Sequence, residues 1–214
     1  MSALTIFSPK AVTLSAPARH KRVMDICLIL LAIPVLLPVL LALAVAVKLS
    51  SPGPVLFFQT RIGRDGQRFR LVKFRSMYTG AEAARAALLA QSDRAGLCFK
   101  QKDDPRVTPV GRVLRRASLD ELPQLWNVLR GEMSLVGPRP ALPEEVALYP
   151  PHALQRLAGL PGLTGLWQVS GRANVSFEEM IDMDLRYLQS ASLHGDLTLI
   201  WRTFGAVALA QGAY

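Results

Sequence analysis

The sequence predicts a mixed α/β protein of the α+β type, in which a membrane-embedded N-terminal helix precedes a small, mainly helical domain. Three observations predict it. Residues 26–47 form an unbroken apolar run, residues 55–60 and 68–74 alternate like the strands of a short hairpin, and the rest has short helical periodicities between Gly and Pro. A length of 214 residues suits one domain with appendages. We therefore divide the chain into a mobile basic tail (1–20), a membrane helix (21–49) and a globular domain (50–214).

The membrane segment has two prolines near its middle and positive charge on both sides. Its 22 residues would span about 33 Å as a helix, enough for a hydrocarbon core of roughly 30 Å. The run is too long for a secretory signal, and no small-residue cleavage site follows it. Pro34 and Pro38 predict a kink. Basic residues precede and follow the run, so the positive-inside rule gives no orientation: Arg19, Lys21, Arg22, Lys48, Arg61 and Arg64. A spanning helix and a re-entrant helix both remain open on these residues.

The globular part begins with a turn at residues 51–54 and the hairpin, whose turn is at residues 64–66. Helices are expected at residues 81–90, 123–129, 177–189 and 198–209, and turns at 161–165 and 171–172. The last helix is apolar on most faces, which suits either a core helix or an amphipathic helix in the membrane interface. The hairpin's basic residues would form a solvated face or bind lipid phosphate: Arg61, Arg64, Arg68, Arg70, Lys73 and Arg75.

The net charge of +9 and a pI near 10.2 indicate an anionic partner: nucleic acid, anionic lipid or a phosphorylated substrate. No nucleic-acid-binding module is recognisable, so we expect membrane lipid and phosphorylated substrates, and no nucleic acid. Cys27 and Cys98 have neither metal-ligand spacing nor a convincing disulfide pairing, which suits a reducing compartment.

The stretch RRASLDELPQLWNVLRGEMSLVGPRP at residues 115–140 places two adjacent carboxylates, Asp120 and Glu121, among arginines. Arginine suits phosphate oxygens, whereas a carboxylate repels them. Arginines and carboxylates can act on the same phosphate only if a cation lies between the carboxylate and the phosphate, or if the carboxylate is the group that attacks the phosphorus. The stretch therefore indicates phosphoryl-transfer chemistry.

A structural interpretation competes with this one. Ser118 and Glu121 have the spacing of a capping box, and acidic residues favour the first turn of a helix. With Ser118 as the cap, however, Pro123 would occupy the fifth helical position, where proline is disfavoured. A helix that starts nearer Leu122 would leave both acids at its edge, facing a ligand.

The chain closely resembles the bacterial sugar transferase family, the monotopic polyprenyl-phosphate phosphoglycosyl transferases that initiate exopolysaccharide, capsule, O-antigen and protein-glycan assembly. The resemblance covers residues 21–210, in the compact form without an N-terminal membrane bundle. Four ordered segments carry it: KRVMDICLILLAIPVLLPVLLALAVAVKL, GPVLFFQTRIGRDGQRFRLVKFRSM, DPRVTPVGRVLRRASLDELPQLWNVLRGEMSLVGPRP and PGLTGLWQVSGR.

The resemblance implies transfer of a sugar-1-phosphate from a UDP-sugar to polyprenyl (undecaprenyl) phosphate, giving polyprenyl-diphospho-sugar and UMP. Asp120 would be the nucleophile of a covalent aspartyl intermediate, and Glu121, with Asp120, would bind Mg²⁺. Arg115 and Arg139 would hold phosphate oxygens. The residues agree with this chemistry, because a carboxylate attacks phosphorus only when a metal and guanidinium groups neutralise the repulsion.

The resemblance also implies re-entry at the bacterial inner membrane, with both helix ends and the catalytic domain on the cytoplasmic face. Two departures are visible. Pro34 and Pro38 follow aliphatic residues where the family often has serine, and Leu160 stands where a basic residue often precedes PGLTG.

For the other motif residues two interpretations are kept. Lys73 would contact substrate or be an exposed strand residue, and Arg172 would meet the nucleotide or pair with an acid. Trp167 and Gln168 suit a packed turn better than a uracil platform. Gly137 and Pro138 would shape the loop that aims Arg139.

Two other functions use the same residues. One is a metal-dependent membrane-bound phosphohydrolase with water as the acceptor. The other is a non-catalytic basic membrane scaffold, for which Asp120→Asn would leave function intact. The sequence leaves open the sugar, the glycan pathway, the position of the helix break and whether an oligomer forms.

Overall fold

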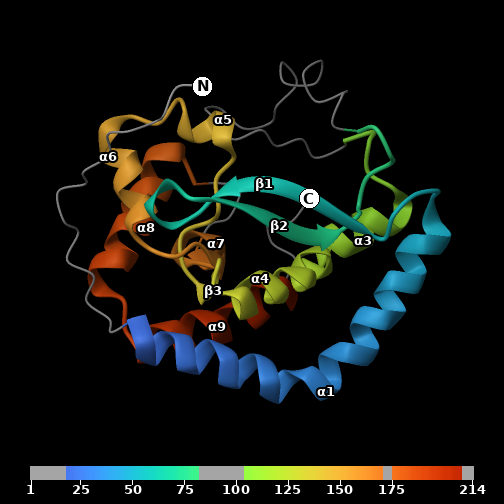
Figure 1. Cartoon of the computed structure of the whole chain (residues 1–214), viewed down its shortest axis with the longest axis horizontal. Helices are drawn as coiled ribbons and strands as arrows, with labels where there is room; N and C mark the ends of the chain where they lie inside the picture. Colours follow the sequence, from blue (N-terminus) through green and yellow to red (C-terminus); the bar gives the residue numbers. More distant parts are fainter. Residues whose placement is uncertain (1–17, 82–103, 171–174, 209–214) are drawn as a thin grey trace.

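The computed structural model describes residues 18–81, 104–170 and 175–208. The long helix α1 (Ala18–Ser50) contains Pro34 and Pro38, and Figure 1 shows it bending about midway along its length. Within the described ranges it is the one helix long and apolar enough to cross a membrane, and its most apolar stretch of 18 residues has a mean hydropathy of 3.1. It begins inside the segment expected to be a tail, and residues 1–17 lie outside the described part.

Both halves of α1 pack against the globular domain, while its middle is exposed. In the first half, Ile29 packs with Val128 and Met133. In the second half, Val47 packs with Phe74 and Leu114. Between them most apolar side chains are exposed, as in Leu31, which is 80% exposed, although Leu40 and Leu43 are partly buried against the second cluster.

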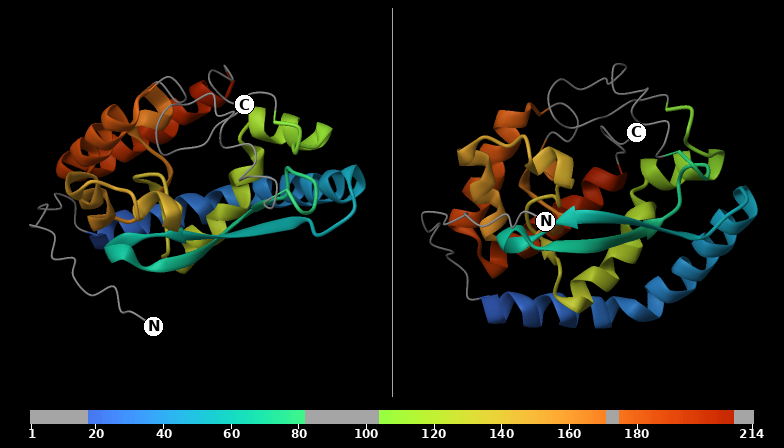
Figure 2. Two further views of the ribbon diagram at one scale, coloured as in Figure 1. Left: turned by 90° about the horizontal axis from the view of Figure 1, so that it is seen from above. Right: turned by 45° about the horizontal axis from the view of Figure 1, so that its top comes forward.

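The predicted hairpin is present. Strand β1 (Leu56–Ile62) pairs antiparallel with β2 (Arg68–Phe74), in a register that places Phe57 opposite Lys73. The short 3₁₀ helix η1 (Arg64–Gly66) joins them. Figure 2 shows the hairpin on one side of the domain and the C-terminal helices on the other.

The segment that contains the two adjacent acids, Asp120 and Glu121 (here called the dyad), is built differently from a capped helix. Helix α3 (Pro109–Arg116) is followed by the 3₁₀ helix η3 (Leu119–Gln124) and by α4 (Leu125–Arg130), which ends at Gly131. Ser118 has a left-handed backbone, φ 53°, and its side chain makes no capping hydrogen bond. The competing interpretation, a capping box at Ser118, is therefore wrong, because this backbone turn separates α3 from η3 and Glu121 N–H instead donates to the Ser118 carbonyl at 3.3 Å. Pro123 lies within η3, and regular α-helix starts only at Leu125.

A second, parallel pair was not anticipated. Strand β3 (Ser134–Val136) pairs with β4 (Gly162–Thr164), inside the segment expected to be a turn. The strands approach closely because position 162 has no side chain: a Cβ there would lie 2.0 Å from the Gly137 nitrogen. Between them run α5 (Pro143–Val146), α6 (Pro151–Leu154) and the 3₁₀ helix η4 (Gln155–Ala158).

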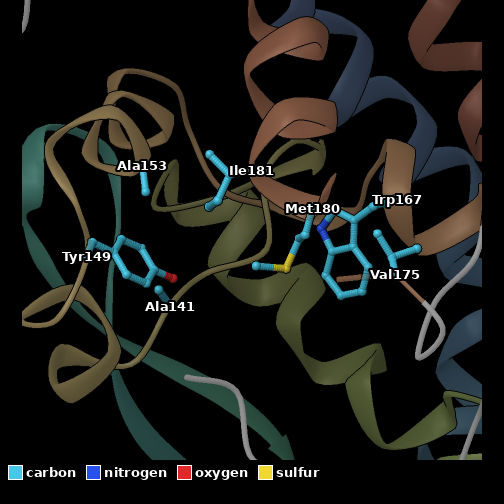
Figure 3. Close-up of a cluster of buried hydrophobic side chains, with 7 residues drawn as sticks. All are labelled: Ala141, Tyr149, Ala153, Trp167, Val175, Met180 and Ile181. Carbon is cyan, nitrogen blue, oxygen red and sulfur yellow. The ribbon is translucent and has the colours of Figure 1, made fainter. Parts of the chain in front are cut away.

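The C-terminal part consists of α7 (Leu166–Ser170), α8 (Phe177–Ser190) and α9 (Leu193–Ala208). Helix α8 agrees with the prediction, whereas α9 begins five residues earlier than expected. The helix predicted at 81–90 and the turn at 171–172 lie outside the described residues, except for Ala81. Figure 3 shows the main core cluster: Ala141, Tyr149, Ala153, Trp167, Val175, Met180 and Ile181.

Candidate active site

Asp120 is the buried member of the dyad. It lies on η3, which packs against β2, and only 6% of its surface is exposed. Burial, and then the charge of Glu121, raise the pKa of Asp120 to about 6, while the charges of Lys73 and Arg115 act in the opposite direction. Asp120 is therefore mainly ionised at neutral pH yet more basic than an ordinary aspartate, which favours nucleophilic attack.

Lys73 is brought to the dyad by β2. Its side chain is partly buried, so it is not the freely exposed strand residue that was one of its two interpretations. Burial lowers the pKa of Lys73 to about 8; the charge of Asp120 raises it, while those of Arg61 and Arg115 lower it further. Lys73 thus changes charge just above neutral pH.

Arg115 reaches the site from the last turn of α3. Its Nε donates to Ser76 Oγ at 2.9 Å. Helix α3 comes this close to Ser76 because position 111 is glycine: a Cβ there would lie 1.9 Å from the Ser76 carbonyl oxygen. Burial is the main cause that lowers the pKa of Arg115.

Arg139 follows β3 and faces Glu121. Its Nη1 lies 3.9 Å from Glu121 Oε1, and 44% of its side chain is exposed. A shallow, open cavity lies at this point, and its lining includes Lys73, Glu121, Gln124, Arg139, Arg61 and Gln168. A second, smaller cavity shares Arg139 and is lined also by Arg156.

The structure thus brings together Asp120, Glu121, Arg115, Arg139 and Lys73. Arg172 lies outside the described residues. Trp167 is buried in the core, as expected for a packed position, although its segment is helical rather than a turn.

Sequence reasoning missed the roles of Asn127 and Arg61. Asn127 is buried; its Oδ1 accepts from Val72 N–H at 3.0 Å and its Nδ2 donates to the Arg70 carbonyl at 2.8 Å. It thereby holds β2, which carries Lys73, against the helix that follows the dyad. Arg61 lines the cavity, but nothing in the sequence separates it from the other basic residues of the hairpin.

Two carboxylate side chains are enough to bind Mg²⁺ if water and substrate phosphates supply its other ligands. Within the described residues, no group of three or more His, Cys, Asp or Glu side chains is arranged to hold a metal ion. Mg²⁺ usually keeps several waters and binds one or two carboxylates together with substrate phosphates. Glu121, at the cavity, and Asp120 beside it therefore fit Mg²⁺.

Comparison with known proteins identifies the family. A family model described as bacterial sugar transferase matches residues 16–210. The exopolysaccharide production protein ExoY of Sinorhizobium fredii is 43% identical over 198 residues, covering 91% of this chain and 88% of that protein. The UDP-glucose:undecaprenyl-phosphate glucose-1-phosphate transferase of Caulobacter vibrioides is 42% identical over 203 residues, covering 91% of this chain and 72% of that protein. The undecaprenyl-phosphate galactose phosphotransferase of Salmonella typhimurium is 43% identical over 166 residues, covering 76% of this chain and 35% of that longer protein. With nearly its whole length matched, the chain belongs to the bacterial sugar transferase family.

Proposed function

We propose that the protein transfers a sugar-1-phosphate from a UDP-sugar to undecaprenyl phosphate, giving undecaprenyl-diphospho-sugar and UMP. This would be the first membrane step of exopolysaccharide or related glycan synthesis. The relatives named above for such transfers support the reaction class. The observation that carries the proposal for this chain is the buried carboxylate of Asp120, set among the charges of Lys73, Arg115 and Glu121.

In the first step, a carboxylate oxygen of Asp120 attacks the sugar-bearing phosphorus. The bond from that phosphorus to the oxygen bridging to UMP breaks, and UMP leaves with the electron pair. In the second step, a phosphate oxygen of the lipid attacks the same phosphorus, and Asp120 departs as a carboxylate. Lys73, Arg115 and Arg139 offset the negative charge that a carboxylate and a diphosphate bring together.

Glu121 is suited to hold Mg²⁺ on the diphosphate, with Asp120 next to it. The bound ion would supply charge neutralisation to the phosphate oxygens. The position of Glu121 opposite Arg139 supports this assignment, because a diphosphate bound by Arg139 would lie next to the carboxylate that would hold the ion.

We further propose that α1 is re-entrant, with both ends on the cytoplasmic face of the inner membrane. A straight spanning helix of this length would hold its ends about 50 Å apart, on opposite faces of the bilayer. Instead, both halves of α1 contact one domain. Near its start, Lys21 pairs with Asp196 of α9, and Arg22 donates to the carbonyls of Val128 and Leu129 at the end of α4.

Helix α9 is proposed to lie in the membrane interface. Exposed apolar side chains recur along it at intervals of three or four residues, which places them on one face: Leu193, Leu197, Trp201 and Phe204. Trp201 is 77% exposed. Lys21 joins α9 to the start of α1, so the two helices are in contact there.

The test is a brief incubation of the solubilised full chain with a panel of UDP-sugars and Mg²⁺, without lipid. We expect about one equivalent of UMP and a phosphosugar mass on Asp120, and transfer when undecaprenyl phosphate is added. Continuous release of free sugar-1-phosphate without lipid would instead identify a hydrolase. UMP that appears only with lipid, without a trapped adduct, would support direct transfer.

A further inference from the structure

We infer that Arg156, paired with Asp184, is a positioning residue that holds the backbone of Arg139 so that the Arg139 guanidinium meets the substrate diphosphate. This inference rests on the proposed function, because it assigns Arg139 to phosphate binding. Arg156 belongs to η4 and lies 17 residues from Arg139, in a segment to which the sequence assigned no site residue.

The loop of residues 137–141 is held by its carbonyl groups. Pro138 and Pro140, on either side of Arg139, have restricted φ angles and no N–H, so backbone hydrogen bonds to this part of the loop go mainly to oxygen. Four consecutive carbonyls each accept one: Pro138 from Gly162 N at 2.8 Å, Arg139 from Arg156 Nη2 at 3.1 Å, Pro140 from Arg61 Nη1 at 3.0 Å and Ala141 from Ile62 N at 2.9 Å.

Arg156 connects the loop to the buried interior through its side chain. Only 3% of its surface is exposed. Its Nη1 donates to Tyr149 Oη at 2.8 Å, and its Nη2 is shared between the Arg139 carbonyl and the carboxylate of Asp184 on α8. A buried guanidinium is costly unless it is paired and hydrogen-bonded, and Asp184 supplies the charge that makes its burial tolerable.

The geometry separates the role of Arg156 from that of Arg139. Arg156 contacts the backbone of Arg139, whereas the side chain of Arg139 extends towards Glu121. Arg156 lines only the smaller cavity, while Glu121 and Lys73 line the larger one. Arg156 therefore acts through Arg139. Fixing the backbone of a long, flexible side chain reduces the ordering that ligand binding would otherwise require.

The expected consequence is weaker diphosphate binding when Arg156 is altered. Arg156→Lys keeps the charge but loses the guanidinium group, whose two terminal nitrogens together bind Tyr149, Asp184 and the Arg139 carbonyl. We expect the Kd for UDP to rise by about tenfold, because weakening one hydrogen bond to a charged group changes a binding constant by about this factor.

The test is a double-mutant cycle on the solubilised full chain, with UDP and Mg²⁺ as the probe and calorimetry as the readout. Arg156→Lys is measured in the natural chain and in an Arg139→Gln background. If Arg156 acts through Arg139, its tenfold effect in the natural chain should fall below about twofold in the second background. An equal effect in both backgrounds would overturn the inference and assign Arg156 to general stability.

A second variant, at the acidic member of the ion pair, and a matched control make the test specific to the pair. Asp184→Asn keeps the shape of the side chain but removes the charge that pairs with Arg156, and we expect it also to weaken UDP binding only when Arg139 is present. Asp182→Asn, on an exposed position of the same helix, should leave the Kd unchanged; a Kd rise there matching that of Asp184→Asn would overturn the inference.

The same measurements distinguish this inference from the proposed function. If Arg139→Gln alone leaves the Kd for UDP unchanged, the phosphate-binding role of Arg139 fails and the positioning role with it. If Arg139→Gln weakens binding but the cycle is additive, only the positioning role fails.

Discussion

The guanidinium of Arg139 and the carboxylate of Glu121 lie 3.9 Å apart, Nη1 to Oε1, although 18 positions separate them along the chain. This approach brings two distant parts of the 115–140 stretch to one cavity and places the Arg139 guanidinium opposite Glu121, the more exposed of the two acids. Asp120, directly before Glu121, is buried beneath it. The two acids therefore have different environments, which allows them different roles.

The rate of the first step should follow a bell-shaped pH profile. The pKa of Asp120 is about 6 and that of Lys73 about 8. As the proposed nucleophile, Asp120 would attack only when ionised, above its pKa, and Lys73 would neutralise phosphate only when protonated, below its pKa. Single-turnover UMP release without lipid, at subsaturating UDP-sugar, should therefore rise through pH 6 and fall above pH 8. Lys73→Arg should remove the fall in rate above pH 8, because arginine stays charged there. If the rate of that variant still falls above pH 8, Lys73 is not the group that causes the fall.

Asp120→Asn should abolish turnover and yet stabilise the fold. An amide cannot form the acyl-phosphate, so we expect a loss of several orders of magnitude. Because the folded-state pKa of Asp120 is raised, its ionisation destabilises the folded state. The natural chain should thus lose stability as the pH rises from about 4 to about 6, by roughly 2 kcal/mol. Asp120→Asn should have the higher Tm at pH 7 and the same Tm near pH 3.5; a lower Tm at pH 7 would contradict this electrostatic account.

Glu121→Gln and Arg139→Lys should impair the same step in different ways. If Glu121 holds Mg²⁺ as proposed, loss of its charge would weaken magnesium binding, and higher Mg²⁺ should restore part of the UMP release. Arg139→Lys keeps the charge but loses the planar guanidinium group, and added Mg²⁺ should not restore UMP release in this variant. Steady-state assays over a range of Mg²⁺ concentrations measure both. Equal rescue of the two variants would show that they do not act through separate contacts.

Asn127→Leu should destabilise the domain by about 2 to 3 kcal/mol. The substitution leaves the buried Val72 N–H and the Arg70 carbonyl without the amide that now pairs with them. Denaturant unfolding measures the loss, and Trp126→Leu, at an exposed position on the same helix, is the control. If Asn127→Leu unfolds at the same denaturant concentration as the control, Asn127 does not hold β2 in place.

Accessibility to an impermeant thiol reagent should distinguish the two topologies of α1. In a chain whose Cys27 and Cys98 are replaced by serine, single cysteines at Ser15 and Gly80 precede and follow the helix. A re-entrant helix predicts that both are shielded in intact cells and labelled after lysis. Labelling of one and protection of the other in intact cells would show that α1 spans the membrane.

The sequence by itself determined the features that depend on local pattern. The apolar run with its two prolines, the hairpin around residues 64–66 and helix α8 follow from periodicity and turn chemistry, which act between near neighbours. The grouping of Asp120 and Glu121 with flanking arginines was also visible in the sequence, because these residues lie within one short stretch and match a family motif.

Only the tertiary structure decided which acid is buried and what surrounds it. Ser118 looked like a helix cap, but its left-handed backbone turns the chain so that Asp120 is enclosed. The parallel pairing of β3 with β4 and the burial of Arg156 against Asp184 depend on contacts between segments more than 25 residues apart. Local patterns carry no signal for such pairings, because what stabilises them is close approach and charge compensation in the folded interior.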